Sequence, residues 1–240
     1  LKDNELIKST MKLVEEKEFK NLLKNLKIEK TISGGSIANS IVGLSQLGNE
    51  VGFIGKVNDD DLGRKYSEGL KREKVKYHYN IKSEKLPTGT CLILITPDSE
   101  RTMCTFLGTA GKINENDIDE KIVKLSKITL LEGYLWDKGE PQKAFNKAII
   151  NSSLSAMSLS DLFCVERHKK YFLDLVQNKL NITFANEQEI MALIKTKNFK
   201  DVIYFAKKIK KLVVITRGEN GAMAIQNDTI VECNAQKNLK

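Results

Sequence analysis

Two adjacent glycines, Gly34 and Gly35, stand directly before an amphipathic stretch with helical spacing, and Asn39 follows them by four residues. Because glycine has no Cβ atom, a ligand can come close to the backbone there, where the free N–H groups of a helix start attract anionic or oxygen-rich groups. The Asn39 amide can donate to and accept from a ligand hydroxyl. The three residues are therefore candidates for binding a hydroxylated ligand. The alternative is a tight strand-to-helix turn with Asn39 exposed to water.

Two later segments combine polar side chains with tight turns. The first, ANEQE, holds Asn186 and Glu189, which a helix cap and an acidic first turn explain locally. The second, ITRGENGA, follows an apolar run and contains Gly218 and Gly221. A hairpin turn explains these two glycines as well as a ligand-binding loop does.

Three further residues could contact a ligand. Glu132 ends the apolar run of KITLLE, where a carboxylate is costly unless it is paired or faces a ligand; a solvent-exposed strand end is the alternative. Arg101 and Met103 lie in TGTCLILITPDSERTMCTFLG. Arg101, at the tip of a predicted hairpin, either reaches a ligand or extends into water.

Other chemistries fit the residues less well. Gly34, Gly35 and Gly43 lack the Gly-x-Gly-x-x-Gly spacing of a dinucleotide-binding turn, and the next predicted strand does not end in an acidic residue. Cys164 and His168 are four residues apart, but nothing nearby completes a metal-ligand set. The sequence therefore predicts no dinucleotide fingerprint and no metal site at that pair.

The elements that must position these residues follow from hydrophobic periodicity. Beyond Asn114, strands and helices alternate, which predicts an α/β fold with a parallel sheet between helices and ligands at the carboxyl ends of the strands. The predicted strands are 127–136, 155–164, 180–186 and 211–218, and the predicted helices are 140–152, 165–179, 187–194 and 199–209.

The first half of the chain is mixed. A short strand over 9–14 and a helix over 15–27 precede the helix after the double glycine, which Gly48 ends, and residues 50–57 then read as a buried strand. Between residues 76 and 108 the apolar residues alternate with polar ones. This pattern predicts a small antiparallel sheet with turns at KLPTG and TPDSER, which we interpret as a lid.

Composition describes an ordinary globular chain of 240 residues, with 41% hydrophobic and 29% charged residues. The net charge of +8 is spread along helix faces, so we expect no nucleic-acid partner. No apolar run approaches the about 20 residues of a membrane helix, so we expect no membrane partner and a cytoplasmic protein. The four cysteines form no CxxC pair, which predicts reduced core thiols.

The run GGSIANSIVGLSQLGNEVGFIGKVNDDDLG, residues 34–63, resembles the first signature of the ribokinase-like (PfkB) family of carbohydrate and nucleoside kinases. The matching residues are Gly34, Gly35, Asn39, Leu47, Gly48, Gly55, Asp60 and Gly63. ANEQE is similar to the family's Asn-x-x-Glu motif, and ITRGENGA is similar to its nucleotide loop. Residues 88–108 and 159–172 resemble the bacterial adenosine-kinase-like branch.

The resemblance implies a three-layer α/β/α sandwich with a mostly parallel central sheet and a small β-sheet lid. It implies a single domain over 1–240, incomplete at both ends, with lid strands within 8–33 and 77–107. The implied activity is transfer of the ATP γ-phosphoryl group, with Mg²⁺, to a primary hydroxyl of a nucleoside, adenosine being favoured. A ribose- or fructose-type sugar kinase and a catalytically inactive binding relative are the alternatives. We expect a monomer or a homodimer formed through the lid.

The family's motifs also assign roles to individual residues. The residues implied for the acceptor are Gly34, Gly35, Asn39, Arg101, Met103 and Glu132. Those implied for ATP are Asn186, Glu189, Thr216, Arg217, Gly218 and Gly221, with Glu189 positioning Mg²⁺ through water. The family's catalytic aspartate belongs to a run expected beyond Lys240, and an acceptor-binding aspartate is expected before Leu1. We therefore predict no catalytic residue within 1–240 and no turnover by these 240 residues alone.

Overall fold

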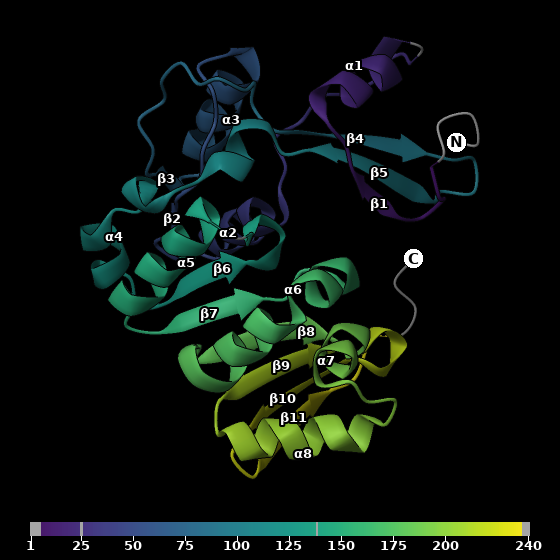
Figure 1. Cartoon of the computed structure of the whole chain (residues 1–240), viewed down its shortest axis with the longest axis vertical. Helices are drawn as coiled ribbons and strands as arrows, with labels where there is room; N and C mark the ends of the chain where they lie inside the picture. Colours follow the sequence, from purple (N-terminus) through teal and green to yellow (C-terminus); the bar gives the residue numbers. More distant parts are fainter. Residues whose placement is uncertain (1–5, 25, 138, 237–240) are drawn as a thin grey trace. The chain divides into compact units, whose positions relative to one another are not determined.

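The computed structural model describes residues 6–24, 26–137 and 139–236. Contacts between residues divide the chain into two compact units, residues 1–113 and residues 114–240. Figure 1 identifies the helices and strands of each unit. That the whole chain forms one domain stays a prediction.

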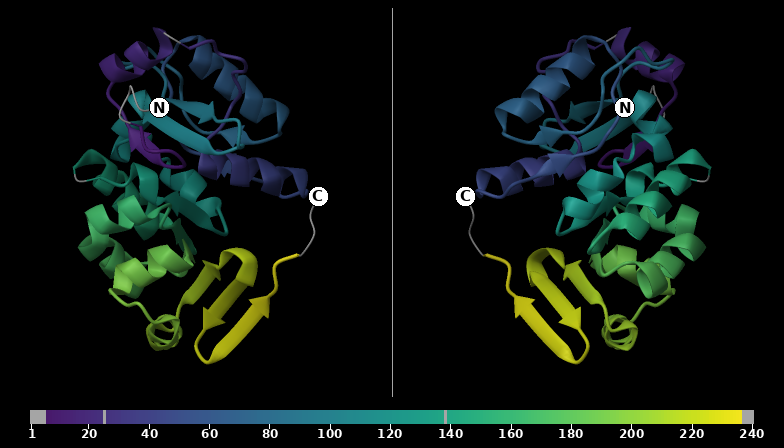
Figure 2. Two further views of the ribbon diagram at one scale, coloured as in Figure 1. Left: turned by 90° about the vertical axis from the view of Figure 1, so that its right-hand side faces the viewer. Right: turned by 90° about the vertical axis from the view of Figure 1, so that its left-hand side faces the viewer.

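The second unit is built on a sheet that has six strands among the described residues, in the order β11-β10-β9-β8-β7-β6. The strands are β6 (Thr129–Glu132), β7 (Ser155–Ser158), β8 (Ile182–Asn186), β9 (Leu212–Thr216), β10 (Ala222–Gln226) and β11 (Thr229–Cys233). Strands β6 to β9 run parallel, and antiparallel pairing adds β10 and β11 at the edge, drawn in yellow in Figure 2. The sheet is thus mostly parallel, as predicted.

Helices connect these strands in alternation. They are α4 (Glu120–Leu125), α5 (Glu140–Asn151), α6 (Leu162–Asp174), α7 (Glu187–Ile194) and α8 (Phe199–Ile209), and a π-helical turn (Leu175–Lys179) continues α6. Helix α5 contacts β6, α7 contacts β8 and β9, and α8 contacts β10. Alternate strand residues such as Val213 and Ile215 are fully buried, together with Phe172 and Ile190 from the helices. Period-2 strands and period-3.6 helices therefore bury one common core.

Two predicted strands of this unit are too long. The strand predicted over 127–136 is only β6, because a 3₁₀ turn (Gly133–Leu135) follows it. The strand predicted over 155–164 ends at Ser158, because the carboxylate of Asp161 accepts the backbone N–H of Cys164 at 2.8 Å and begins α6. The apolar pattern alone indicated one strand over 155–164, but the N-cap aspartate starts a helix within it.

The first unit contains a sheet of order β1-β5-β4, formed by β1 (Met11–Leu13), β5 (Arg101–Phe106) and β4 (Thr90–Ile95). Strands β4 and β5 form an antiparallel hairpin with its turn at TPDSER, as predicted, and β1, from outside the predicted range of 76–108, adds a strand parallel to β5. Helix α1 (Glu16–Lys24) packs on one face, with Leu22 buried against Cys104 and Phe106. These strands lie within the ranges 8–33 and 77–107; their action as a lid stays a prediction.

A second layer of this unit holds α2 (Ser36–Gln46) and α3 (Asp61–Arg72) around Ala38, Leu70 and Val75. Gly48 follows α2 with φ +86°, as predicted for a helix stop. The predicted strand over 50–57 reduces to β2 (Gly52–Phe53), which pairs in parallel with β3 (Lys76–Tyr77). Residues 76–82 therefore do not join the β4–β5 hairpin. The apolar run of residues 50–57 therefore indicates that residues such as Val57 are buried, and not that the whole run is one strand.

All four cysteines are free, but only Cys104 and Cys164 are buried. Cys91 and Cys233 are exposed, so the expectation of four core thiols is wrong for these two: Cys91 lies at an exposed position of β4, and all residues of β11, Cys233 among them, are exposed. Among the helices that the structure describes, none is long and apolar enough to cross a membrane.

Candidate functional site

The carboxyl ends of the parallel strands in the second unit carry most of the polar residues singled out by the sequence. The register pairs Glu132 with Ser158, Ser158 with Phe184, and Asn186 with Thr216. Because parallel strands end at the same edge of a sheet, Glu132, Asn186 and Thr216 lie along one rim. This rim is where a ligand is expected in a sheet of this kind.

Asn186 and Glu189 form a reciprocal capping box at the start of α7. The Asn186 side chain accepts the backbone N–H of Glu189 at 2.8 Å, while Glu189 accepts the backbone N–H of Asn186 at 3.0 Å and its amide N–H at 2.7 Å. Both carboxylate oxygens of Glu189 are thus held in place. The local explanation offered by the sequence is present, and it fixes the carboxylate at the rim.

Glu189 is only 5% exposed. Burial raises the pKa of its carboxyl above the ordinary value; the Asn186 N–H opposes this rise, and the negative charge of Asp161 adds to it. The carboxyl therefore takes up a proton more readily in the folded chain than in the unfolded chain. A cation or a phosphate-bound metal brought to this rim would favour the ionised form.

The raised pKa of Glu189 predicts a stability that depends on pH. Since the folded-state pKa lies above the unfolded value, the stabilising contribution of the protonated group is fully present below about pH 4 and is lost as the pH rises through the folded-state pKa. We expect Glu189→Gln to remove this loss, as measured by urea unfolding at a series of pH values. The exposed Glu219→Gln is the control and should keep the wild-type profile. An unchanged profile in Glu189→Gln would contradict the assignment.

The loop between β9 and β10 is a closed turn. A 3₁₀ turn spans Gly218–Asn220, the backbone N–H of Arg217 donates to the carbonyl of Gly221 at 2.8 Å, and that of Gly221 donates to the carbonyl of Gly218 at 3.0 Å. Because β9 and β10 are antiparallel, the segment has the hairpin connection that the sequence left open. Its two glycines differ: Gly218 has open space around it, whereas the main chain after β11 lies against Gly221.

The Arg217 side chain points away from the loop's own backbone. Its Nε donates to Oε2 of Glu187 at 2.9 Å, and its guanidinium lies 4.0 Å from the centre of the Phe199 ring. Sequence analysis missed both partners. An acidic residue at the first position of α7 and an aromatic residue opening α8 were the available signals, but neither indicates which cation it meets.

Glu132, at the end of β6, lies in an acidic neighbourhood. Asp161 follows β7, and burial together with Asp161 and Glu132 raises the pKa of the Cys164 thiol to about 12. Burial and the charges of Asp161 and Glu132 also raise the pKa of Tyr134. Sequence analysis missed Asp161 because it lay inside a predicted strand, although its position three residues before Cys164 is typical of a helix cap.

In the first unit the double glycine leads into α2, with open space at Gly34 and the Ala38 side chain near Gly35. Gly35 is the N-cap of α2 with φ +109° and no side-chain cap, and a Cβ atom at Gly34 would meet nothing within 4 Å. Asn39 is exposed, and its side chain has no hydrogen-bond partner among the described residues. The start of α2 therefore keeps uncapped N–H groups beside a free amide.

Arg101 and Met103 share one face of β5. They alternate with Thr102, Cys104 and Phe106, which are buried on the α1 side, so both point to the opposite face. Arg101 is exposed and Met103 is partly buried. Within the described residues, no hydrogen bond or ion pair joins these two side chains to Gly34, Gly35 or Asn39.

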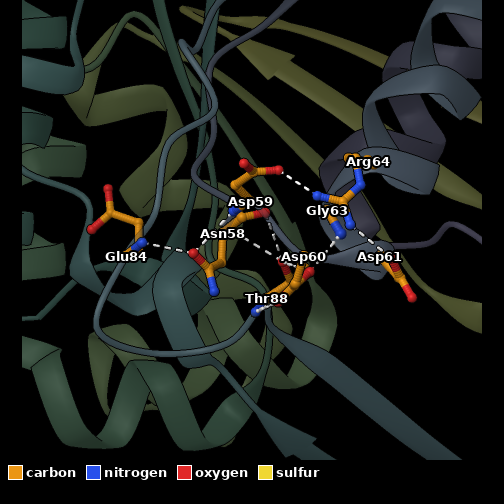
Figure 3. A network of polar contacts seen from close by, with 8 residues as sticks. All are labelled: Asn58, Asp59, Asp60, Asp61, Gly63, Arg64, Glu84 and Thr88. Atoms are coloured by element: carbon orange, nitrogen blue, oxygen red, sulfur yellow. Dashed lines mark hydrogen bonds and ion pairs between the residues drawn. The ribbon is translucent and has the colours of Figure 1, made fainter.

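The Asp-x-x-Gly end of the signature has a structural role (Figure 3). The Asp60 carboxylate accepts the N–H of Gly63 at 2.8 Å and both the N–H and the hydroxyl of Thr88, at 2.8 and 2.7 Å. Burial works to raise the pKa of Asp60, but the hydrogen bonds from Thr88, Gly63 and Asn58 outweigh it and lower the pKa. Asp60 thus caps α3 and ties it to Thr88.

The donor set for a metal is sparse. In the part of the chain that the structure describes, no group of three His, Cys, Asp or Glu side chains could hold a metal ion. Mg²⁺ is commonly held by one or two carboxylates together with substrate phosphates and water. Glu189 at the rim fits that arrangement, and a metal held by protein side chains alone does not.

Comparisons with known proteins show what the chain is similar to. The model of the pfkB family of carbohydrate kinases matches residues 2–239. The 5-dehydro-2-deoxygluconokinase of Clostridium botulinum (strain Eklund 17B / Type B) is 28% identical over 235 residues, which cover 90% of this chain and 66% of that protein. The chain thus spans slightly less than two thirds of the length of this relative.

Two solved structures are similar over almost the whole chain. The adenosine kinase from Sinorhizobium meliloti has a TM-score of 0.93 at 31% identity, covering 100% of this chain and 75% of that one. A probable sugar kinase from Rhizobium etli CFN 42 has a TM-score of 0.91 at 31% identity, covering 99% and 73%. These similarities confirm the predicted ribokinase-like α/β/α fold.

Proposed function

This chain belongs to the pfkB family of carbohydrate kinases, and from that premise we propose that its sites serve transfer of the ATP γ-phosphoryl group to a primary hydroxyl of a nucleoside. The observation that carries the proposal is the rim of the second unit. There the capping box of Asn186 and Glu189 follows the end of β8. The loop after Thr216 follows the end of the neighbouring strand β9. A fixed carboxylate could help to hold a metal, and the backbone of the loop could approach a triphosphate.

The nucleotide side of the proposal uses backbone more than side chains. Thr216, Arg217, Gly218 and Gly221 form a closed loop with open space at Gly218, so that the main chain there can approach a nucleotide. Asn186 holds the Glu189 carboxylate, which would position Mg²⁺ through water. When bound, Mg²⁺ neutralises charge on the transferred phosphoryl group.

The acceptor side uses the start of α2. The bare peptide at Gly34 and Gly35 and the free amide of Asn39 would bind the acceptor hydroxyls. Packing requires neither the glycine at position 34 nor Asn39, whereas the backbone conformation at Gly35 favours glycine by itself. Arg101, Met103 and Glu132 are proposed as further acceptor contacts, Arg101 toward the transferred phosphoryl group. Positioning the hydroxyl and the phosphoryl group in line, together with electrostatic stabilisation, supplies the rate enhancement in such a reaction. The base that takes the hydroxyl proton is not among the residues assigned.

Adenosine or a similar nucleoside is the acceptor we favour. The similarity to an adenosine kinase at 31% identity supports it. A sugar or sugar acid is the second candidate, because a probable sugar kinase is equally similar and a 5-dehydro-2-deoxygluconokinase is 28% identical. A relative that binds these ligands without turnover is the third.

The test is an ADP-release assay on the native polypeptide with adenosine, ribose, fructose and 5-dehydro-2-deoxygluconate. We expect the highest kcat/KM with adenosine, and we expect Asn39→Ala to lower kcat/KM by about 10-fold through the loss of one neutral hydrogen bond. Ser40→Ala, on the same exposed helix, is the matched control and should leave kcat/KM unchanged. An unchanged kcat/KM in Asn39→Ala would place the acceptor elsewhere, and ATP binding without turnover would favour the binding relative.

A further inference from the structure

Arg217 connects three segments of the second unit. It opens the loop after β9, its carboxylate partner Glu187 is the first residue of α7, and its aromatic partner Phe199 is the first residue of α8. The Arg217 side chain is 22% exposed and that of Glu187 is 32% exposed. The contact is therefore shielded more than an ordinary surface ion pair.

The contacts of the Arg217 side chain indicate that it holds the loop in place and does not bind a ligand. The Nε atom donates to Glu187, and the guanidinium carbon lies over the Phe199 ring, 4.0 Å from the ring centre. A planar guanidinium held by a carboxylate and an aromatic ring loses little further freedom, and its charge is already compensated. The side chain that the motif suggested as an ATP ligand is thus turned toward two helix starts.

The first turn of α7 contributes both to the capping box and to the contact with Arg217. Glu187 lies between Asn186 and Glu189 in the sequence, so the turn that forms the capping box also holds Arg217. The Arg217 N–H in turn closes the loop onto Gly221. Fixing the Arg217 side chain therefore fixes the spacing between the loop and the Glu189 carboxylate.

We propose that Arg217 is a positioning residue: with Glu187 and Phe199 it clamps the loop of residues 217–221 to the starts of α7 and α8, so that the loop is ordered before a nucleotide arrives. The proposal rests on the proposed nucleotide site. A preordered loop lowers the entropy cost of binding, so the clamp acts on ATP affinity and not on the acceptor.

The variant Glu187→Gln separates a clamp from a direct ATP ligand, because the two roles predict opposite signs. If Arg217 bound phosphate directly, removing the carboxylate would free its charge and tighten ATP binding. If it clamps the loop, the same change loosens the loop and weakens binding. Phe199→Leu removes the ring but keeps an apolar side chain, and Arg217→Lys keeps the charge but loses the planar guanidinium.

The experiment measures three quantities in the native polypeptide: ATP–Mg²⁺ affinity by calorimetry without acceptor, amide hydrogen exchange at Arg217 and Gly221 without nucleotide, and the acceptor KM. We expect Glu187→Gln, Phe199→Leu and Arg217→Lys each to weaken ATP binding about 5-fold and to speed exchange at both amides by a similar factor. The acceptor KM should not change. Lys143→Ala breaks the exposed ion pair with Glu140 in α5 and should alter none of the three.

Tighter or unchanged ATP binding in Glu187→Gln would overturn the clamp, as would unchanged amide exchange in all three variants. The proposed function and the Arg217 clamp can be disproved independently of each other. If the wild-type polypeptide does not bind ATP, the proposed function fails, while the exchange rates still decide whether Arg217 orders the loop.

Discussion

Replacing Gly221 with alanine will destabilise the protein by about 3 kcal/mol or more, because two independent costs act at this position. Gly221 has φ +80° and ψ −134°, a conformation that side-chain-bearing residues rarely adopt. A Cβ atom there would also overlap the carbonyl oxygen of Cys233 and lie 2.7 Å from the backbone nitrogen of Ala235. Both neighbours are main chain, so the end of β11 must shift. Urea unfolding followed by circular dichroism measures the loss.

Gly218→Ala is the matched control in the same loop. Gly218 also has a positive φ, +55°, but a Cβ atom would meet nothing within 4 Å. The only cost expected for alanine is that of the left-handed backbone conformation, about 1–2 kcal/mol of the free energy of unfolding. A Gly221→Ala variant no less stable than Gly218→Ala would show that β11 does not press on the loop as described. The comparison also separates the two glycines of the motif: packing requires Gly221, whereas the open space at Gly218 is available to a ligand.

Gly63→Ala will lower the free energy of unfolding by about 3 kcal/mol, although the same substitution usually stabilises a helix. Gly63 lies in the first turn of α3, and a Cβ atom there would overlap the carbonyl oxygen of Asn58 and lie 2.9 Å from Oγ1 of Thr88. Relieving the overlap would move Asn58 and Thr88. The hydrogen bonds of Thr88 to Asp60, about 1 kcal/mol each, would then weaken.

Gly43→Ala in α2 provides the opposite expectation. Gly43 lies inside the helix, and a Cβ atom would meet nothing within 4 Å. Alanine should therefore stabilise the protein by about 0.5–1 kcal/mol through helix propensity alone. Unfolding by urea under identical conditions gives both values. If Gly63→Ala also stabilised the protein, the close packing of α3 against Asn58 would be wrong.

These glycines divide the family signature into two kinds of residue. Gly48 ends a helix, Gly55 lies against the Phe53 ring, and Asp60 with Gly63 caps α3 against Asn58 and Thr88. The fold itself demands these residues. Gly34 and Asn39 differ, because the described structure offers them open space and no side-chain partner, whereas the φ of +109° at Gly35 favours glycine for the backbone itself. Nothing in the structure explains Leu47, which is 80% exposed. Residues that packing does not require are the ones left for a ligand, which supports the proposed acceptor site.

The sequence by itself determined the features that depend on near neighbours. The alternation of strands and helices after Asn114, the stop at Gly48 and the cap at Asn186 were all predicted, because each arises from hydrophobic period or from hydrogen bonds within one turn. The kinase family was also predicted, because its first signature is a run of local turns and caps. Asp161 was a local signal of the same kind that the apolar pattern concealed.

Only the tertiary structure decided which distant segments meet. Strand β1 pairs in parallel with β5 across about ninety residues of chain, and β2 pairs with β3 instead of extending through residues 50–57. Arg217 meets Glu187 and Phe199, which are separated from it by a strand and by helices. A one-dimensional pattern specifies which face of an element is buried, but not which partner buries it. That choice depends on the packing of all the elements at once.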